Sequence, residues 1–331
     1  MDLEKRVFAA RDGQFEDLAL DLFQFQYYNN PVYHQYCNLL KADPDTVDVL
    51  EQIPFLPISF FKTHHIAATD FEPELIFESS GTTATVNSKH LVKDAALYTQ
   101  SFMQGFERFY GKVDRRCILG LLPSYLERNN SSLVYMVDEL IKQSHHPLSG
   151  FYLYDLEKLH RTILHNEILK QPTLLIGVTY ALLDFAEKFP MQLRHTIVME
   201  TGGMKGRREE LTRQQVHRQL QEKLGVHLVH SEYGMTELLS QAYSKGDGIF
   251  HCPAWMKVLT REEDDPFAVH LPAAESEKPL TGALNIIDLA NIYSCSFIAT
   301  SDMGRLYSNG SFEVLGRLDN SDIRGCSLLA V

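Results

Sequence analysis

Five small residues in an unbroken row, Ser79-Ser80-Gly81-Thr82-Thr83, follow the apolar run at residues 75–77. Glycine lets a backbone pass close to a ligand, and exposed amides beside hydroxyl side chains form a concave donor array that suits phosphate. The row has neither the GxxxxGK spacing nor the final lysine of the Walker motif. It predicts a phosphate-binding loop of another kind, and a plain Ser/Thr/Gly turn is the alternative interpretation.

A second group of such residues lies where predicted strands end. HSEYGMTE (residues 230–237) follows the predicted strand VHLVH (residues 226–230), and open α/β sheets bind ligands at the carboxyl ends of their strands. Gly202 and Gly203 follow the predicted strand TIVME (residues 196–200). Because adjacent glycines allow a planar base to approach the backbone closely, we assign this pair to an adenine pocket.

Two carboxylates complete the group. Asp302 lies near the end of another predicted strand, and Glu237 ends the YGMTE stretch. Each also has an ordinary structural interpretation. Asp302 fits a turn or a helix N-cap, and Glu237 fits a cap for a helix that begins after Gly234, where the helix dipole favours negative charge.

The composition limits the kinds of protein that this chain can be. Its 331 residues are 44% hydrophobic and 22% charged, and the net charge of −12 argues against a nucleic-acid partner. The sequence contains neither a signal peptide nor an apolar run long enough to span a membrane, so we expect a cytoplasmic protein. The five cysteines have no CxxC spacing and predict no disulfide framework: Cys37, Cys117, Cys252, Cys295 and Cys326.

The order of the predicted elements indicates an α/β fold that positions these motifs. Helical spacing is found in the N-terminal quarter, and β-rich runs alternate with amphipathic stretches after residue 75. The predicted helices are 15–25, 33–40, 94–109, 133–141, 155–169 and 207–224, and the predicted strands are 75–77, 117–122, 173–178, 195–199 and 226–230. This alternation predicts mainly parallel strands. A β-rich subdomain follows at 282–289, 295–300 and 305–316, the last a hairpin around Asn309-Gly310.

Taken in order, the three motifs SSGTT (79–83), YGMTE (233–237) and TSDMGRLYSNGSFEVLGRLDNSDIRG (300–325) resemble the adenylate-forming superfamily of acyl and aryl ligases. The resemblance implies ATP and Mg²⁺ as cofactors. It assigns Ser79, Ser80, Gly81, Thr82 and Thr83 to the phosphates, Tyr233, Gly234 and Thr236 to the nucleotide, Glu237 to magnesium and Asp302 to the ribose hydroxyls. The chemistry suits these residue types, because attack of a carboxylate on the α-phosphate collects negative charge that amides and Mg²⁺ neutralise.

Within that superfamily the chain is similar, over nearly its whole length, to the LuxE-type acyl-protein synthetases. The similarity rests on IPFLPISFFKTH (53–64), LPSYLERNNSSLVYMVDEL (122–140), the helical opening FQFQYYNNPVYHQYC and the ending GRLDNSDIRGCSLLAV. The family resemblance implies activation of a fatty acid and acyl transfer to a cysteine near the C-terminus, here Cys326. It also implies a partner acyl reductase that takes up the acyl group.

The sequence also departs from the larger ligases, which carry a catalytic lysine in a small C-terminal domain. The 15 residues that follow Gly316 are too few to fold such a domain. Lys62, Lys205 and Arg317 are the candidates for supplying its charge, and Lys89 is the candidate for contacting phosphate in place of a loop lysine. We therefore expect a helical region at 1–70, an adenylate-forming α/β domain with a β-rich end at 71–316 and a short tail at 317–331 that carries Cys326.

Two other functions stay open at this point. A binding or scaffold protein that kept the fold and lost turnover is consistent with the missing small domain. An acyl- or aryl-CoA ligase would use free coenzyme A as the final acceptor, although Cys326 near the C-terminus disfavours it. An acid-dependent exchange of pyrophosphate into ATP separates the enzymes from the scaffold.

Overall fold

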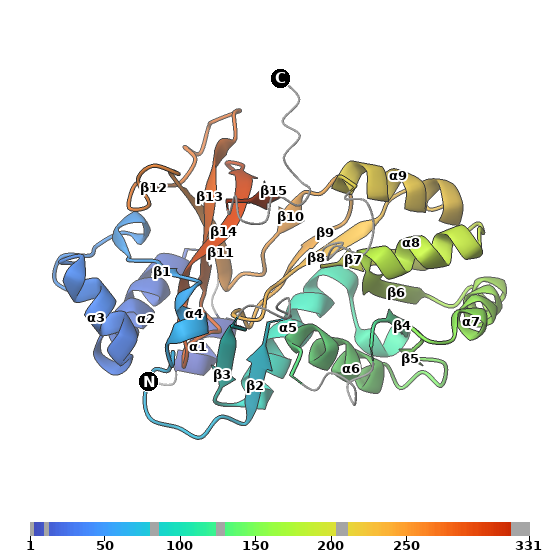
Figure 1. Ribbon diagram of the computed structural model, residues 1–331, viewed down its shortest axis with the longest axis horizontal. Helices are drawn as coiled ribbons and strands as arrows, with labels where there is room; N and C mark the ends of the chain where they lie inside the picture. Colours follow the sequence, from blue (N-terminus) through green and yellow to red (C-terminus); the bar gives the residue numbers. More distant parts are fainter. Residues whose placement is uncertain (1–2, 10–12, 80–85, 124–129, 203–210, 319–331) are drawn as a thin grey trace.

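The computed structural model describes residues 3–9, 13–79, 86–123, 130–202 and 211–318, and the overall arrangement is shown in Figure 1. One hydrophobic core runs through these residues, from Val7 in the first helix to Phe312 in the last strand. Among the described residues, every helix is too short or too polar to cross a lipid bilayer.

A parallel sheet forms one half of the molecule, as the sequence predicts. Its strands are β4 (Cys117–Leu121), β5 (Gly150–Phe151), β6 (Thr173–Val178), β7 (Thr196–Thr201) and β8 (His230–Tyr233). They lie side by side in the order β5-β4-β6-β7-β8, all parallel. Figure 1 shows α8 (Thr179–Lys188) and α9 (Arg213–Leu224) on one face, and α5 (Ala95–Tyr110) and α6 (Ser132–Ser144) on the other. Because both faces are covered, β4 and β6 are fully buried and apolar.

Local capping sets where these helices begin and end. Asp94 caps α5, and Asp155 caps α7 (Leu156–Leu169). The helix predicted to begin at Arg207 begins at Arg213, because Thr212 and Gln215 form a reciprocal capping box there. Residues 207–210 lie outside the described part of the chain.

The strand predicted at residues 226–230 is displaced toward the C-terminus. Gly225 ends α9 in a left-handed conformation, and β8 begins only at His230. The reason is its pairing with the last residues of β7, which places Ser231 opposite Glu200 and Glu232 opposite Thr201. The start of the HSEYGMTE stretch is therefore the strand itself, and the rest of the motif leaves the sheet at its carboxyl edge.

The β-rich half continues the same sheet in antiparallel fashion. From β8 the order is β9 (Ala242–Ser244), β10 (Phe250–His251), β15 (Phe312–Arg317), β14 (Phe297–Leu306), β13 (Leu280–Asp288), β11 (Met256–Arg261) and β12 (Val269–His270). The predicted hairpin between β14 and β15 is confirmed. Its turn differs from a two-residue turn, because Gly310 alone takes a positive φ, of 80°, and the amide of Tyr307 donates to the carbonyl of Ser311 at 2.9 Å.

The position predicted for Asp302 near a strand end is wrong. β14 runs unbroken through Asp302, and the irregularity in its pairing with β15 comes just afterwards, between Met303 and Gly304. A side chain added at Gly304 would meet the carbonyl of Glu313 at 2.4 Å, so the bulge needs a glycine. β14 is therefore one long strand with the bulge inside it. The largely buried residues 297–302 precede the bulge, and the residues that lead into the hairpin turn follow it.

The N-terminal helices pack against this β-rich half. They are α1 (Leu3–Ala9), α2 (Phe15–Asn29), α3 (Pro31–Leu39) and α4 (Phe60–Thr63), with the short strand β1 (Leu56–Pro57) between α3 and α4. β1 pairs with β14, and the fully buried amide of Gln26 donates to the carbonyls of Asn291 and Ile292 at 3.0 and 2.8 Å. The boundaries 1–70, 71–316 and 317–331 stay a prediction.

The predicted strand 75–77 does not join the main sheet. It belongs to β2 (Leu75–Glu78), which pairs with β3 (Lys89–Val92) as a separate two-stranded ribbon. β3 was not predicted from the sequence. The two strands flank the hydroxyl-rich row, so that row connects the arms of a hairpin.

Candidate active site

The base of the hydroxyl-rich loop is closed by two serines. The amide of Ser79 donates to the carbonyl of Ser88 at 3.1 Å, and the amide of Ser88 donates to the Ser79 hydroxyl at 2.9 Å. Ser80, Gly81, Thr82 and Thr83 lie outside the described residues. The two strands of the ribbon therefore hold both ends of the loop, Ser79 and Ser88, in contact with each other.

Tyr233 and Asp302 meet at the carboxyl edge of the sheet. Tyr233 is the last residue of β8, and its hydroxyl donates to Asp302 Oδ2 at 2.8 Å, with both residues buried. The ring of Tyr233 contacts Phe250 and Phe312, with centroid distances of 5.8 and 5.4 Å. Burial, followed by the negative charge of Asp302, raises the pKa of Tyr233 well above its ordinary value, so the phenol stays a donor.

Arg317 supplies a positive charge beside this pair. Its Nε lies 3.4 Å from Asp302 Oδ1, and 71% of its side chain is exposed. Because most of the Arg317 side chain is exposed, its guanidinium can also contact a ligand. The structure thus brings together three residues that the sequence selected from two separate motifs.

Glu237 lies in the connection between β8 and β9. No helix begins after Gly234 in the described structure, so the helix-cap interpretation of Glu237 is wrong. The residue is buried, and burial raises the pKa of its carboxyl above the ordinary value. A hydrogen bond from the side chain of Ser88 and the positive charges of Arg317 and Lys62 act in the opposite direction. Glu237 is thereby linked to the base of the hydroxyl-rich loop and to the Arg317 side of the site.

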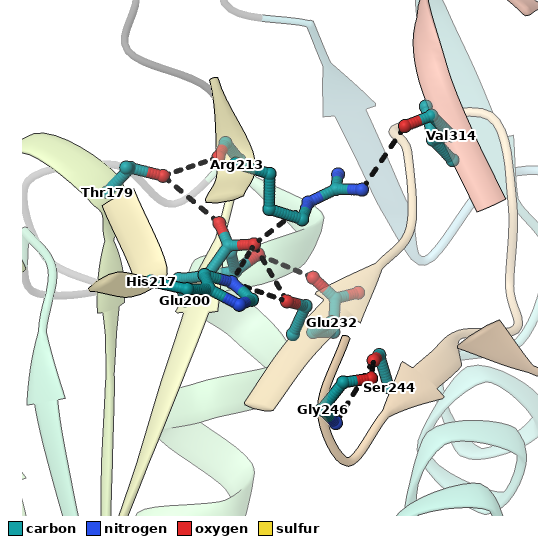
Figure 2. Close-up of polar contacts among 11 residues, drawn as sticks. Thr179, Glu200, Arg213, His217, Glu232, Ser244, Gly246 and Val314 are labelled. Carbon is teal, nitrogen blue, oxygen red and sulfur yellow. Dashed lines mark hydrogen bonds and ion pairs between the residues drawn. The ribbon is translucent and has the colours of Figure 1, made fainter. Parts of the chain in front are cut away.

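A cluster around Glu200 was not anticipated from the sequence (Figure 2). Glu200 is buried at the end of β7, where it accepts hydrogen bonds from Ser231 at 2.8 Å and from Thr179 at 3.1 Å. Arg213 Nε and His217 Nε2, both from α9, lie 3.4 and 3.5 Å from Glu200 Oε1. The cluster joins the start of α8, the end of β7 and the start of β8 to the N-terminal half of α9.

The electrostatics of this cluster keep the carboxylate ionised. Burial alone would raise the pKa of Glu200. The hydrogen bond from His217, the charge of Arg213 and the hydrogen bond from Ser231 together outweigh burial, and the pKa is held below its ordinary value. Arg213 also donates to the carbonyl of Val314 at 3.2 Å, so the cluster reaches the antiparallel half of the sheet.

The same cluster supports the glycine pair. Thr179 donates to the carbonyl of Gly202 at 2.9 Å, and Gly202 has a φ of 69° that favours glycine. A Cβ atom added at Gly202 would meet no atom of the described residues within 4 Å. Gly203 and Lys205 lie outside the described residues.

Gly234 is required for a different reason. A Cβ atom at this position would lie 2.5 Å from Glu232 Oε1 and 3.2 Å from Gln241 Cγ. The other carboxylate oxygen of Glu232 accepts a hydrogen bond from Thr201, and burial raises the pKa of Glu232 to about 7. Thr236 is half-buried, and its carbonyl faces His90 at 2.7 Å.

Three lysines are candidates for supplying positive charge to the site, and they differ in their surroundings. Lys62 is exposed and close enough to act electrostatically on Glu237. Lys89 lies 3.6 Å from Glu78 across the ribbon and is 63% exposed. Lys205 cannot be placed among the described residues.

The residues that the sequence analysis missed are buried polar groups just outside the motifs. Glu200 lies two positions before Gly202, which is the one signal that could have identified it. His90 lies in β3 and Asn291 follows β13, and neither residue belongs to a sequence motif. In the described ranges, no three His, Cys, Asp or Glu side chains gather as a metal-binding group.

Comparison with solved structures identifies the fold. The ATP-bound MatB of Rhodopseudomonas palustris matches with a TM-score of 0.53 and 15% identity, over 73% of this chain and 47% of that one. O-succinylbenzoate coenzyme A synthetase (MenE) of Bacillus subtilis, solved with ATP and magnesium, matches at 0.51 and 16%, over 73% and 49%. The luciferase-like enzyme of the nonluminescent mealworm Zophobas morio matches at 0.50 and 15%, over 78% and 61%.

These likenesses confirm the α/β fold class of the adenylate-forming enzymes, and the chain spans about half the length of the MatB and MenE structures that it matches. A search of curated protein sequences found no match. The family model described as "Acyl-protein synthetase, LuxE" matches residues 8–330, almost the entire sequence. The chain therefore belongs to the LuxE acyl-protein synthetase family.

Proposed function

We propose that this protein activates a carboxylic acid, a fatty acid foremost, by joining it to the AMP part of ATP. The observation that carries the proposal is the meeting of Tyr233, Asp302 and Arg317 at the carboxyl edge of the sheet, with Glu237 in the adjoining loop. Family membership and the similarity to structures solved with ATP bound support the same reaction.

The residues of the site suit the first chemical step. A carboxylate oxygen of the acid attacks the α-phosphorus of ATP, the bond from that phosphorus to the bridging oxygen breaks, and pyrophosphate leaves with the electron pair. Asp302 is suited to accept hydrogen bonds from ribose hydroxyls, because Tyr233 and Arg317 hold its carboxylate in place. Arg317, together with the residues Ser80 to Thr83 that the sequence assigns to the phosphates, would offset the charge that develops there.

Magnesium fits the donors that the chain provides. Glu237 offers a buried carboxylate oxygen, a hard ligand of the kind that Mg²⁺ prefers, and Mg²⁺ commonly uses one or two carboxylates together with phosphate oxygens. The pKa of the Glu237 carboxyl is raised because the groups around it stabilise its buried negative charge only in part. A bound cation would stabilise that charge further. When bound, the metal would neutralise charge on the phosphates, with Glu237 as its protein ligand.

For the second step we propose Cys326 as the acyl acceptor. Its thiolate would attack the carbonyl carbon of the acyl-adenylate, a carbon–sulfur bond would form, and AMP would leave with the oxygen. Cys326 lies outside the described residues, so the support comes from the other four cysteines. Burial raises the pKa of Cys37 and Cys252 to about 12 and also raises those of Cys117 and Cys295, which leaves each of them a poor nucleophile.

A protein that accepts the acyl group from Cys326, such as an acyl reductase, would be the final partner. Transfer to free coenzyme A is the second candidate, since one of the similar structures is O-succinylbenzoate coenzyme A synthetase (MenE). A nucleotide-binding scaffold without turnover is the third.

The deciding experiment is the exchange of labelled pyrophosphate into ATP with a panel of saturated fatty acids, aryl acids and short dicarboxylic acids. We expect exchange that requires both an acid and Mg²⁺. Exchange with none of the acids, together with retained ATP binding, would favour the scaffold and contradict the enzyme.

A further inference from the structure

The loop between β8 and β9, residues 234–241, is shaped by side chains from outside it. Within the loop, the amide of Leu238 donates to the carbonyl of Met235 at 3.2 Å. At its C-terminal end, the amides of Leu239 and Ser240 donate to the buried carboxylate of Asp288 at 2.8 and 2.9 Å. Two further side chains, those of His90 and Asn291, contact backbone carbonyls of the YGMTE motif.

His90 anchors the carbonyl of Thr236. Its side chain comes from β3 and is 1% exposed, and its Nδ1 lies 2.7 Å from that carbonyl oxygen. Its Nε2 lies 3.0 Å from Asn291 Oδ1. Burial lowers the pKa of His90 to about 4, so the ring is neutral at pH 7 and carries one proton. Both ring nitrogens face acceptor oxygens, so the single proton can serve only one of the two contacts. The shorter contact assigns it to Nδ1, which donates to Thr236, and Nε2 then lies beside Asn291 Oδ1 without a hydrogen bond.

Asn291 anchors the next carbonyl along the chain. Its Nδ2 donates to the carbonyl of Glu237 at 2.8 Å and to the carbonyl of Cys295 at 2.9 Å. Because both amide hydrogens are occupied by carbonyls, the amide cannot turn over without losing both bonds. Its Oδ1 must therefore face His90. Two consecutive peptide groups of the motif are held by two buried side chains that also contact each other.

The segment that carries His90 also touches the hydroxyl-rich loop. Ser88 closes the base of that loop against Ser79, and its side chain bonds to the carboxyl of Glu237. Residues 88 and 90 are two positions apart, and in an extended chain such side chains point to the same side. Ser88 and His90 therefore face the motif from the same side of the chain. A single short segment therefore contacts the motif at its carboxyl group and at its backbone.

We propose that His90 is a positioning residue that fixes the Thr236-Glu237 backbone through its hydrogen bond to the carbonyl of Thr236, and so sets the affinity of the site for magnesium-bound ATP. The inference rests on the proposed function, because it gives Glu237 the metal. In metal sites, removal of the group that orients a ligand typically lowers metal affinity or activity about 10- to 100-fold. His90 acts here through the backbone of the residue that precedes the ligand.

The test compares nucleotide binding with and without metal by calorimetric titration of the full chain, so that turnover is not needed. We expect His90→Ala to weaken binding of Mg²⁺–ATP by about tenfold or more. Binding of ATP in excess chelator should change less than about threefold, because the ribose and phosphate contacts do not pass through Glu237. A merely structural role would weaken both titrations together.

Two conservative variants sharpen the comparison and guard against poor folding of His90→Ala. Asparagine places its amide nitrogen near the position of Nδ1, and glutamine places it near Nε2. His90→Asn should therefore keep the bond to Thr236 and bind Mg²⁺–ATP close to the parent value, whereas His90→Gln should resemble His90→Ala. Asn166→Ala is the matched control, because it removes a buried 3.0 Å hydrogen bond to Thr173 at the opposite, amino edge of the sheet.

The outcomes separate the two proposals. If the parent chain binds no Mg²⁺–ATP, the proposed function is overturned and the role of His90 with it. If the parent binds and His90→Ala keeps the parent affinity, or loses metal-free ATP equally, only the positioning role is overturned. Equal behaviour of His90→Asn and His90→Gln would also overturn it.

Discussion

The hydroxyl of Tyr233 donates to Asp302 Oδ2 at 2.8 Å, across a buried contact between β8 and β14. The two residues are 69 positions apart, one in the parallel half of the sheet and the other in the antiparallel half. A carboxylate held in this way keeps its second oxygen toward Arg317 and the open edge of the sheet. The pair supplies the first prediction.

Asp302→Ala should weaken ATP binding by about 1 to 3 kcal/mol, because a charged acceptor for the ribose hydroxyls is lost. Tyr233→Phe is the matched control, since it keeps the ring against Phe250 and Phe312 and leaves the carboxylate in place. It should cost less. Calorimetric titration with ATP measures both, and equal affinity in parent and Asp302→Ala would remove Asp302 from the site.

Glu237→Gln should lower pyrophosphate exchange and its response to magnesium together, because an amide is a weaker ligand for a hard cation. The measurement is the magnesium concentration that gives half-maximal exchange. Glu262→Gln, at an exposed carboxylate paired with His270, is the control and should leave the curve unchanged. Full magnesium dependence in Glu237→Gln would show that the carboxyl is not a metal ligand.

Glu232 should make the protein less stable as the pH rises from 4.5 toward 7. Its folded pKa, about 7, lies above the ordinary value of 4.5, so the folded chain holds a proton that the unfolded chain releases in this window. The loss amounts to at most about 3 kcal/mol and is complete above pH 7. Glu232→Gln should therefore be more stable than the parent at pH 8, with the difference vanishing near pH 4.5.

Urea unfolding of the parent and Glu232→Gln across this range checks the prediction. Asp288, with a pKa raised to about 6, titrates in the same window in both proteins, so only the difference between the two curves reports on Glu232. Parallel curves would mean that Glu232 ionises normally in the folded protein.

Ser231→Ala should lower the free energy of unfolding by about 1.5 to 3 kcal/mol, because the hydroxyl donates to the buried, ionised Glu200. Ser294→Ala is a matched loss of a buried hydroxyl whose partner is the neutral carbonyl of Ile66, and should cost about 0.5 to 1.5 kcal/mol. Denaturant unfolding at pH 7 measures both. Equal losses would indicate that Glu200 carries no charge.

Cys326→Ser should abolish a hydroxylamine-labile acyl group on the protein while acid-dependent pyrophosphate exchange persists. Labelled fatty acid, ATP and magnesium are incubated with the protein, followed by denaturation and mass mapping. Cys252→Ser is the control at a partly exposed thiol and should keep the label. Label on a different cysteine, or only on added coenzyme A, would contradict the proposed acceptor.

The sequence predicts the parallel half of the fold well, because buried parallel strands are short apolar runs between capped amphipathic helices. The predicted strand TLLIGV has the same bounds as β6, and Asp94 and Asp155 cap the helices that were expected to follow them. The order of the thirteen-stranded sheet could not be predicted, because it depends on pairings such as β10 with β15 that leave no local pattern.

The candidate site divides in the same way. Tyr233, Asp302 and Gly202 could be selected from the sequence because they lie in motifs, and the structure places Tyr233 in contact with Asp302. His90, Asn291 and Glu200 were not found, because each acts on a backbone or a side chain distant along the chain. A lone histidine in an apolar strand carries no local mark of the carbonyl that it will meet.

The bond from Gln26 to the carbonyl of Asn291 spans 265 positions, and β1 pairs with β14 over a similar separation. Such contacts form only after a large loop has closed, which slows folding. During synthesis, α2 and β1 leave the ribosome long before Asn291 and β14 have been made, so their apolar faces are exposed to solvent during that time. The N-terminal helices therefore cannot dock before the residues near 291–299 have been made, and until then their uncovered apolar faces favour aggregation and chaperone binding.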